Sequence, residues 1–230
     1  MIAIVPSIRL PRRKRNAFSL VELLTVMAII GVLTTVSMTG FASLLSSNHL
    51  NEATSVVQEQ LELARQTAKT LNRSVQLRFY QDQNNTAAAA SIDCMQIVVP
   101  AANSGTGTDQ PVEKPMLLPQ GVIIADSSSD LVPTAFSSSS PTFKSFNPLP
   151  SANYTGCYML TFSPTGAVTA TDNTGKSVSP TPSGTVYWVL SIVPQTQYRA
   201  KGSSVNVGML QNYATFYLNS VNGSYSCARP

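Results

Sequence analysis

The sequence predicts an α+β protein: one long N-terminal helix packed on a small, mostly antiparallel β-sheet head. Two observations predict this fold class. No proline occurs from Phe18 to Arg73, and apolar residues recur there at helical spacing. After Arg73, short β-branched and aromatic runs alternate with turn residues, which predicts six to eight strands. The 230 residues suffice for one modest domain and an anchor.

Four segments divide the chain by composition. Residues 1–17 are a basic leader, 18–45 the apolar half of the helix, 46–73 its amphipathic half, and 74–230 a β-rich head with long loops. Charged residues make up only 11% of the chain and apolar residues 43%. Intrinsically disordered chains are highly charged and poor in aromatics, so this composition favours a folded protein.

The net charge of +4 belongs to the leader. Five of the 15 Lys and Arg residues lie in it: Arg9, Arg12, Arg13, Lys14 and Arg15. The rest of the chain has 10 Lys and Arg against 11 Asp and Glu, so its net charge is about −1. The basic balance therefore indicates a targeting segment and disfavours a nucleic-acid surface. Arg65, Lys69 and Arg73, spaced along the helix, are typical of a solvated helix face.

The segment after the leader is long and apolar enough to cross a bilayer. Phe18 to Val36 spans about 19 residues with one charge, Glu22. The preceding positive charge should stay in the cytoplasm, which directs the C-terminal body outward. Three interpretations compete: a secretory signal cleaved near Ser37–Ser43, an uncleaved anchor, and a prepilin signal that is cut before Phe18.

Glu22 favours the third interpretation. A carboxylate inside a membrane helix costs a few kcal/mol unless it is paired. A cut between Ala17 and Phe18 creates an α-amine four residues before Glu22. The two groups then lie on one helix face, or meet between neighbouring subunits.

The run KRNAFSLVELLTVMAIIGVL resembles the type III signal of type IV pilins and type II secretion pseudopilins. That signal has a basic leader, a small residue before the cut, Phe after it and Glu four residues later. The resemblance implies cleavage between Ala17 and Phe18 by a prepilin peptidase, and N-methylation of Phe18. It also implies that Glu22 neutralises the N-terminus of an adjacent subunit. Ala17 departs from the family pattern, in which glycine is usual.

The second half of the helix is amphipathic. A helix from Ser19 to Asn72 would be about 80 Å long. The apolar stripe that should pack on the head comprises Leu50, Ala53, Val57, Leu61, Ala64, Ala68 and Leu71. The repeat lasts about three turns, which favours intramolecular packing over a coiled coil.

The head is expected to contain six to eight short strands, which eight runs of the sequence could form. They are residues 74–80, 94–99, 121–125, 157–162, 168–170, 185–193, 214–218 and 224–227. Turns are expected at Ser163–Gly166 and Val221–Gly223, and loops at Pro100–Pro115 and Ser127–Asn153.

The helix-to-strand junction LNEATSVVQEQLELARQTAKTLNRSVQLRFY and the hairpin YMLTFSPTGAVTA resemble the pseudopilin H and minor pilin T family. The ending YATFYLNSVNGSYSCARP is similar, more weakly, to the pilin-like Verru_Chthon cassette protein D family. Both resemblances imply the same helix-plus-sheet fold.

Three cysteines, Cys94, Cys157 and Cys227, form no CxxC pair, which disfavours a zinc knuckle or a redox motif. For an exported body we expect one disulfide and one odd thiol, with three pairings open; three buried free thiols are the alternative.

No motif for an enzyme, metal site or cofactor is found. His49 is the only histidine, so a His-based triad or zinc site is not expected. No G-x-S-x-G elbow, EF-hand loop or P-loop occurs. We expect a non-catalytic protein without metal or cofactor.

These observations predict a subunit, expected to be minor, of a type IV pilus or type II secretion pseudopilus. It would lie in the inner membrane as a single-pass protein in contact with membrane lipid, its body in the periplasm, and then enter an extracytoplasmic filament. The expected partners are other pilin or pseudopilin subunits, a prepilin peptidase and the inner-membrane assembly platform. Two alternatives stay open: a filament-displayed adhesin or cargo reader, and a plain membrane-anchored extracytoplasmic protein. DNA binding is disfavoured, because the tail from Asn222 carries only Arg229 as a cation.

Overall fold

The structure is a computed structural model of the chain. It describes residues 19–82, 92–101, 108–125, 154–171, 177–178, 186–201, 210 and 212–229. Side chains are described for all of these except 36–44, 81–82, 155–157, 171, 177–178 and 199–201. The expected loop at Ser127–Asn153 therefore lies outside the described residues. The chain divides into two compact units, Met1–Leu44 and Leu45–Pro230.

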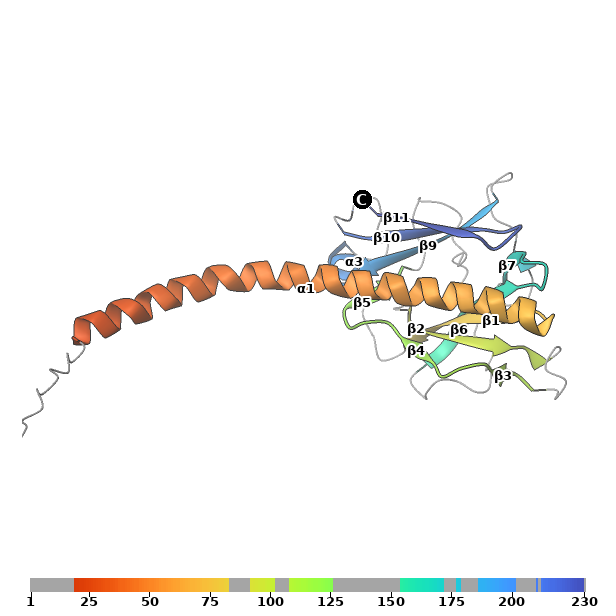
Figure 1. Cartoon of the computed structure of the whole chain (residues 1–230), viewed down its shortest axis with the longest axis horizontal. Coiled ribbons are helices and arrows are strands. Elements are labelled where there is room, and N and C mark those ends of the chain that lie inside the picture. The colour runs from red at the N-terminus through yellow and green to blue at the C-terminus, as the bar shows by residue number, and fades with distance from the viewer. Residues whose placement is uncertain are drawn as a thin grey trace, which may run out of the picture. The chain divides into compact units, whose positions relative to one another are not determined.

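One helix, α1, runs from Leu20 to Leu71, close to the expected Ser19 to Asn72 (Figure 1). It ends in a Schellman motif. The Arg73 amide donates to the Ala68 carbonyl at 3.2 Å, and the Asn72 amide donates to Lys69 at 3.3 Å. Asn72 has a φ of 49°, the left-handed conformation that this cap requires and that asparagine tolerates.

The strands of the second unit form one sheet in the order β11-β10-β9-β5-β2-β1-β6-β7-β8, with β3 and β4 paired to β2. Every described strand pair is antiparallel, which confirms the α+β fold class. Their bounds are β1 Val75–Asp82, β2 Ile92–Val99, β3 Gln110–Pro111, β4 Met116–Leu117, β5 Val122–Ile124, β6 Tyr154–Phe162, β7 Val168–Thr171, β8 Ser177–Val178, β9 Tyr187–Pro194, β10 Ala214–Asn219 and β11 Tyr225–Ala228.

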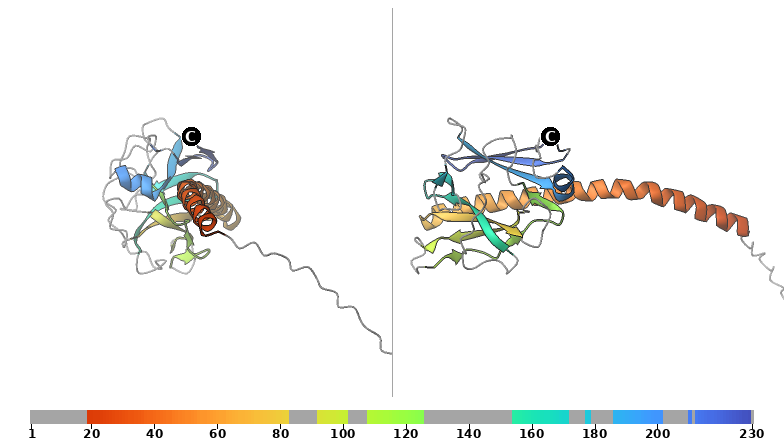
Figure 2. Two further views of the ribbon diagram at one scale, coloured as in Figure 1. Left: turned by 90° about the vertical axis from the view of Figure 1, so that its left-hand side faces the viewer. Right: turned by 180° about the vertical axis from the view of Figure 1, so that it is seen from behind.

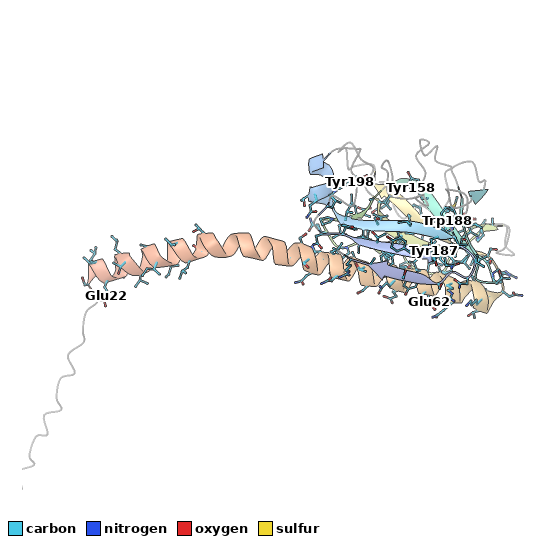
Figure 3. All side chains as sticks on the ribbon, turned by 90° about the horizontal axis from the view of Figure 1, so that it is seen from above. Glu22, Glu62, Tyr158, Tyr187, Trp188 and Tyr198 are labelled. Carbon is cyan, nitrogen blue, oxygen red and sulfur yellow. The ribbon has the colours of Figure 1, made fainter. Side chains whose placement is uncertain are left out.

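All eight expected strands are present, and both expected turns join their hairpins. The sequence reasoning missed the two-residue strands β3, β4 and β8, and the short helix α3, Gln195–Lys201. Two residues are too few to show a period of two, so these strands carry no pattern of their own. α3 covers a second small core, in which Tyr198 packs with Ile123 and Val193 on β5 and β9 (Figure 3).

The second half of α1 supplies one wall of the main core. Six of the seven predicted stripe residues are buried, from Leu50 to Ala68. Leu71 is 47% exposed, so its predicted burial is wrong; it is the last residue of the helix. Opposite the helix, Val75, Leu77 and Phe79 alternate along β1 and are fully buried. Strands lie on both sides of this half of the helix (Figure 2).

At two places around the second half of α1, only a few contacts join neighbouring parts of the sheet. On one side, β2 and β5 share a single residue pair, Ile92 with Ile124. On the other, the Val168 amide donates to the Ser220 carbonyl at 2.8 Å, and the Trp188 indole donates to the Val168 carbonyl at 3.0 Å. These bonds join the β6–β7 hairpin to β9 and the β10–β11 turn.

Two glycines make this second closure possible. A Cβ added to Gly223 would lie 2.6 Å from the Gly166 carbonyl oxygen. Both residues also have positive φ, 66° for Gly223 and 93° for Gly166, which side chains disfavour. The predicted turns thus place glycine where two hairpins touch.

A polar network crosses the face of β1 and β2 that points away from α1. The Arg78 side chain is only 1% exposed and donates to Asp109 at 2.6 Å and to Gln76 at 2.7 Å. Asp109 also accepts the Ala101 amide at 2.7 Å, and Tyr80 donates to Gln96. Because Arg78 and Asp109 are 31 residues apart, no local sequence pattern could have predicted the pair.

The cysteines require a correction. Cys94 and Cys227 are free, so the expected disulfide does not join them. Cys227 packs on the α1 side of the sheet, whereas Cys94 lies opposite Tyr80 on the other face. Cys157, whose side chain lies outside the described residues, is opposite Tyr80 on β6. Two strand spacings, about 10 Å, then separate Cys94 from Cys157, beyond the roughly 7 Å that a disulfide tolerates between Cα atoms.

Candidate functional site

The first half of α1 presents apolar side chains on all sides (Figure 3). Among its described side chains, 19–35, the exposed fractions of the large apolar ones run from 49% for Val26 to 80% for Leu20. The set is Leu20, Val21, Leu23, Leu24, Val26, Met27, Ile29, Ile30, Val32 and Leu33. A contiguous apolar surface of this kind marks a region that a membrane or other protein chains cover.

Three threonines interrupt this surface without leaving free hydroxyl groups. The Thr25 hydroxyl donates to the Glu22 carbonyl at 2.9 Å, and the Thr35 hydroxyl to Val32 at 2.8 Å. Thr34 donates to Ile30 and Gly31 at 3.0 and 2.9 Å. Hydroxyls bonded to the preceding helical turn need no outside partner, so these residues suit an apolar environment.

Glu22 is the only charged side chain between residues 19 and 35. It is exposed in the first turn of α1, where the helix dipole favours a negative charge. Its carboxylate has no hydrogen-bond or ion-pair partner among the described residues. Any partner would therefore come from the residues before 19 or from another molecule.

The residues predicted to be cut and methylated, Ala17 and Phe18, lie outside the described residues, as does the leader. Their roles stay predictions. Within the part of the chain that the structure describes, no helix has the length and apolar character that a membrane crossing requires. The predicted crossing, Phe18 to Val36, includes Phe18 and a Val36 side chain that are not described.

The remaining candidate residues make structural contacts. His49 Nδ1 lies 2.9 Å from the Gln120 carbonyl oxygen, so it acts as the donor and ties α1 to the loop before β5. Arg229, the only cation of the tail, donates to the Asn51 side chain on α1. Tyr225 donates from β11 to the Gln58 carbonyl at 3.4 Å. Each contact fastens one flank of the helix to the head.

The thiol of Cys94 has low reactivity near neutral pH. Burial, together with the neighbouring Asp93 carboxylate, raises the pKa of Cys94 to about 12, although a hydrogen bond with Tyr154 lowers it somewhat. The thiolate is the reactive form, so little of it exists near neutral pH. Burial and Glu62 also raise the pKa of Tyr225. Within the described residues, no group of three His, Cys, Asp or Glu side chains is placed to hold a metal ion.

Comparison with known proteins gives one match. A family model described as the prokaryotic N-terminal methylation motif matches residues 12–38. Searches of curated proteins and of solved structures found no significant match.

The matched range includes the end of the basic leader, the predicted cut before Phe18, Glu22 and the exposed apolar surface. It supports a type IV pilin-like protein. The motif is that of structural subunits processed by a prepilin peptidase, which are anchored in the membrane and later join an extracytoplasmic filament with other pilin subunits. The narrower resemblances, to pseudopilin H, minor pilin T and the Verru_Chthon family, stay predictions.

Proposed function

We propose that this chain is a non-catalytic subunit of a type IV pilus or type II secretion pseudopilus. One observation carries the proposal: among the described residues, Glu22 is a single carboxylate without a partner, in an otherwise apolar exposed helix surface, inside the matched residues 12–38. An ordinary anchor has no use for that carboxylate. A filament subunit needs the carboxylate, because the new N-terminal amine of each subunit requires a counter-charge.

Processing creates that N-terminus. A prepilin peptidase would cut the Ala17–Phe18 peptide bond at the cytoplasmic side and release the leader with its five cations. The new α-amine of Phe18 would then be methylated, which retains its positive charge. The mature chain would start at the apolar surface and carry a net charge of about −1.

Assembly then follows from the balance of two energies. An unpaired carboxylate within a membrane helix costs about 2.5–3.5 kcal/mol. Each large apolar side chain contributes about 1.5–3 kcal/mol when it is fully buried. The ten exposed side chains therefore outweigh Glu22, and the segment stays buried in lipid or protein. Glu22 decides how the segment is buried, because pairing with the Phe18 amine of a neighbour removes both buried charges at once.

Before assembly, the subunit would wait in the inner membrane with its head in the periplasm and in contact with the assembly platform. Within the class, we place it near pseudopilin H and minor pilin T. The support is the order of elements: β1 follows α1 after three residues, and the β6–β7 hairpin turns at Ser163–Gly166 before β9.

The test is Glu22→Ala in the full chain, expressed with a prepilin peptidase and an assembly system, with Glu22→Asp as the matched control. Mass spectrometry should find both variants starting at methylated Phe18. Removing one member of a buried ion pair costs about 3–5 kcal/mol, so filament entry of Glu22→Ala should fall at least about 100-fold. Glu22→Asp should retain most of it.

Two results would contradict the proposal. Normal filament entry by Glu22→Ala would remove the role of the carboxylate. A mature chain that starts at Met1, or near Ser37–Ser43, would leave an anchored or secreted binding protein as the better description.

A further inference from the structure

The outer face of β9, β10 and β11 is the face that points away from α1. Tyr187 and Trp188 are neighbours on β9 (Figure 3), and successive side chains of a strand point to opposite faces. Trp188 is 2% exposed in the main core, whereas Tyr187 is 45% exposed. On β10, Phe216 and Leu218 belong to the main core, and Tyr217 between them is 37% exposed. Two tyrosines therefore lie on the outer face.

The strand register places further polar side chains beside these tyrosines. Tyr187 pairs with Asn219, so Tyr217, two residues earlier on β10, is a diagonal neighbour of Tyr187 at about 7–8 Å. On β11, Ser226 pairs with Tyr217 and is exposed. Paired residues of adjacent strands point to the same face. These four residues, Tyr187, Tyr217, Asn219 and Ser226, are here called the tyrosine face.

The side chains of the tyrosine face have hydrogen-bonding groups to offer. Neither Tyr187 nor Tyr217 has a hydrogen-bond or ring partner among the described residues. The side-chain oxygen of Asn219 accepts the amides of Val221 and Asn222 at 2.8 and 3.3 Å. These two bonds hold the Asn219 side chain in place and leave its NH₂ group as a donor. A ligand would find two aromatic rings, two phenol hydroxyl groups and a fixed amide donor.

Charge and size limit what the tyrosine face can bind. Among the described strand positions on this face, none is charged. Nucleic acids and anionic lipids bind through cations, so neither suits this face. A tyrosine side chain has about 150–250 Å² of surface, so the exposed part of the two rings is on the order of 150 Å². A stable protein interface buries about 800 Å² on each partner, which favours a small neutral ligand here.

We propose that the tyrosine face binds a neutral glycan. A sugar ring has a face of C–H groups and a rim of hydroxyl groups. The C–H groups carry a partial positive charge, which the negative face of an aromatic ring attracts. The sugar hydroxyl groups bond to the phenols of Tyr187 and Tyr217 and to the Asn219 amide. A flat, β-linked chain covers both tyrosines with successive sugar rings.

The tyrosine face is separate from the surface that the proposed assembly uses. It lies on the side of β9 and β10 opposite the main core, whereas assembly is proposed to use the first half of α1. The inference therefore goes beyond the proposed function, and it does not require that a filament forms. Each can fail without the other.

Titration calorimetry of the full chain tests the proposal, in a mild detergent that has no sugar headgroup. The probes are cellohexaose and chitohexaose, which are neutral, flat and β-linked. The unaltered chain should bind at least one probe with a dissociation constant of about 0.1–1 mM, as expected for a shallow exposed site. Binding of chitohexaose alone would indicate a glycan of N-acetylated sugars, and binding of cellohexaose alone an unsubstituted glycan; both results support the proposal.

Matched variants assign the binding to the tyrosine face. Tyr187→Ala with Tyr217→Ala should weaken binding at least about 30-fold, because both aromatic faces are lost. Tyr187→Phe with Tyr217→Phe keeps the rings and should weaken binding by about fivefold at most. Leu117→Ala removes a side chain that is 60% exposed on β4, and it should have no effect. Thermal unfolding verifies that each variant is folded.

Three results would overturn the proposal. The first is an unaltered chain that binds neither probe. The second is a folded double-alanine variant that binds as tightly as the unaltered chain. The third is a loss of filament entry in that variant without any glycan binding by the unaltered chain, which would make the tyrosine face a contact between subunits.

Discussion

The two halves of α1 share one helical backbone and differ in what can cover them. In the second half, one stripe from Leu50 to Ala68 is buried by the chain's own strands, and the opposite face carries charges. In the described part of the first half, the apolar residues lie all round the helix and are exposed. A one-sided apolar pattern can be satisfied by one sheet, whereas an all-round pattern requires surroundings on every side.

This difference shows that the two halves of one helix require different surroundings. The chain's own strands bury the apolar stripe of the second half, so substitutions in this stripe should affect the stability of the head. In the proposed function, lipid or other subunits cover the first half, so substitutions there should affect retention and assembly instead. Two predictions test that division by comparing a position in the second unit with one in the first half of α1, and a third compares two positions within the head.

The largest effect is expected from Leu61→Ala. Leu61 is 1% exposed in the main core, and truncating a buried leucine lowers the free energy of unfolding by about 2–5 kcal/mol. Leu23→Ala, the same change in the first half, should alter that free energy by less than about 0.5 kcal/mol. Urea unfolding of the full chain in mild detergent, followed by the fluorescence of the single tryptophan, Trp188, measures both. Equal losses in the two variants would contradict the division.

A second pair of variants sharpens the comparison through glycine. Gly223→Ala should lower the free energy of unfolding by about 2–3 kcal/mol, because a Cβ clashes with the Gly166 carbonyl and positive φ disfavours alanine. At Gly31, where nothing lies within 4 Å of an added Cβ, alanine should stabilise the helix by about 1 kcal/mol. Far-UV circular dichroism during thermal unfolding reports both. A stabilised Gly223→Ala would mean that the two hairpins do not close around the helix.

The last effect, which vanishes at neutral pH, concerns the dry interior of the head. Since the pKa of Cys94 rises from 9.0 to about 12 on folding, the unfolded chain loses this proton first as the pH rises. The free energy of unfolding should therefore fall by up to about 1.4 kcal/mol per pH unit between about pH 9 and 12, with no contribution below pH 9. Cys94→Ala should remove that part of the slope, while Cys227→Ser should retain it. An identical slope in Cys94→Ala would show that the thiol is hydrated.

Much of this architecture could be predicted from the local pattern of the sequence. The bounds of α1, the eight expected strands and the two turns depend on neighbouring residues, and they were predicted correctly. Glu22 could be singled out because one charge stands in a long apolar run. The errors arose where local pattern carries no information. Leu71 continues the spacing of the stripe but is the last residue of the helix, and the cysteines lie on strands whose separation depends on sheet order.

The sequence by itself determined that a basic segment precedes an apolar helix with one carboxylate, because charge and hydropathy are properties of composition and spacing. It also determined that the helix continues into an amphipathic half. Only the tertiary structure decided which residues meet across the sheet. The buried Arg78–Asp109 pair, the contact between Gly166 and Gly223 and the separation of Cys94 from Cys227 each join segments far apart in the chain. Such contacts depend on strand order and register, which no local periodicity encodes.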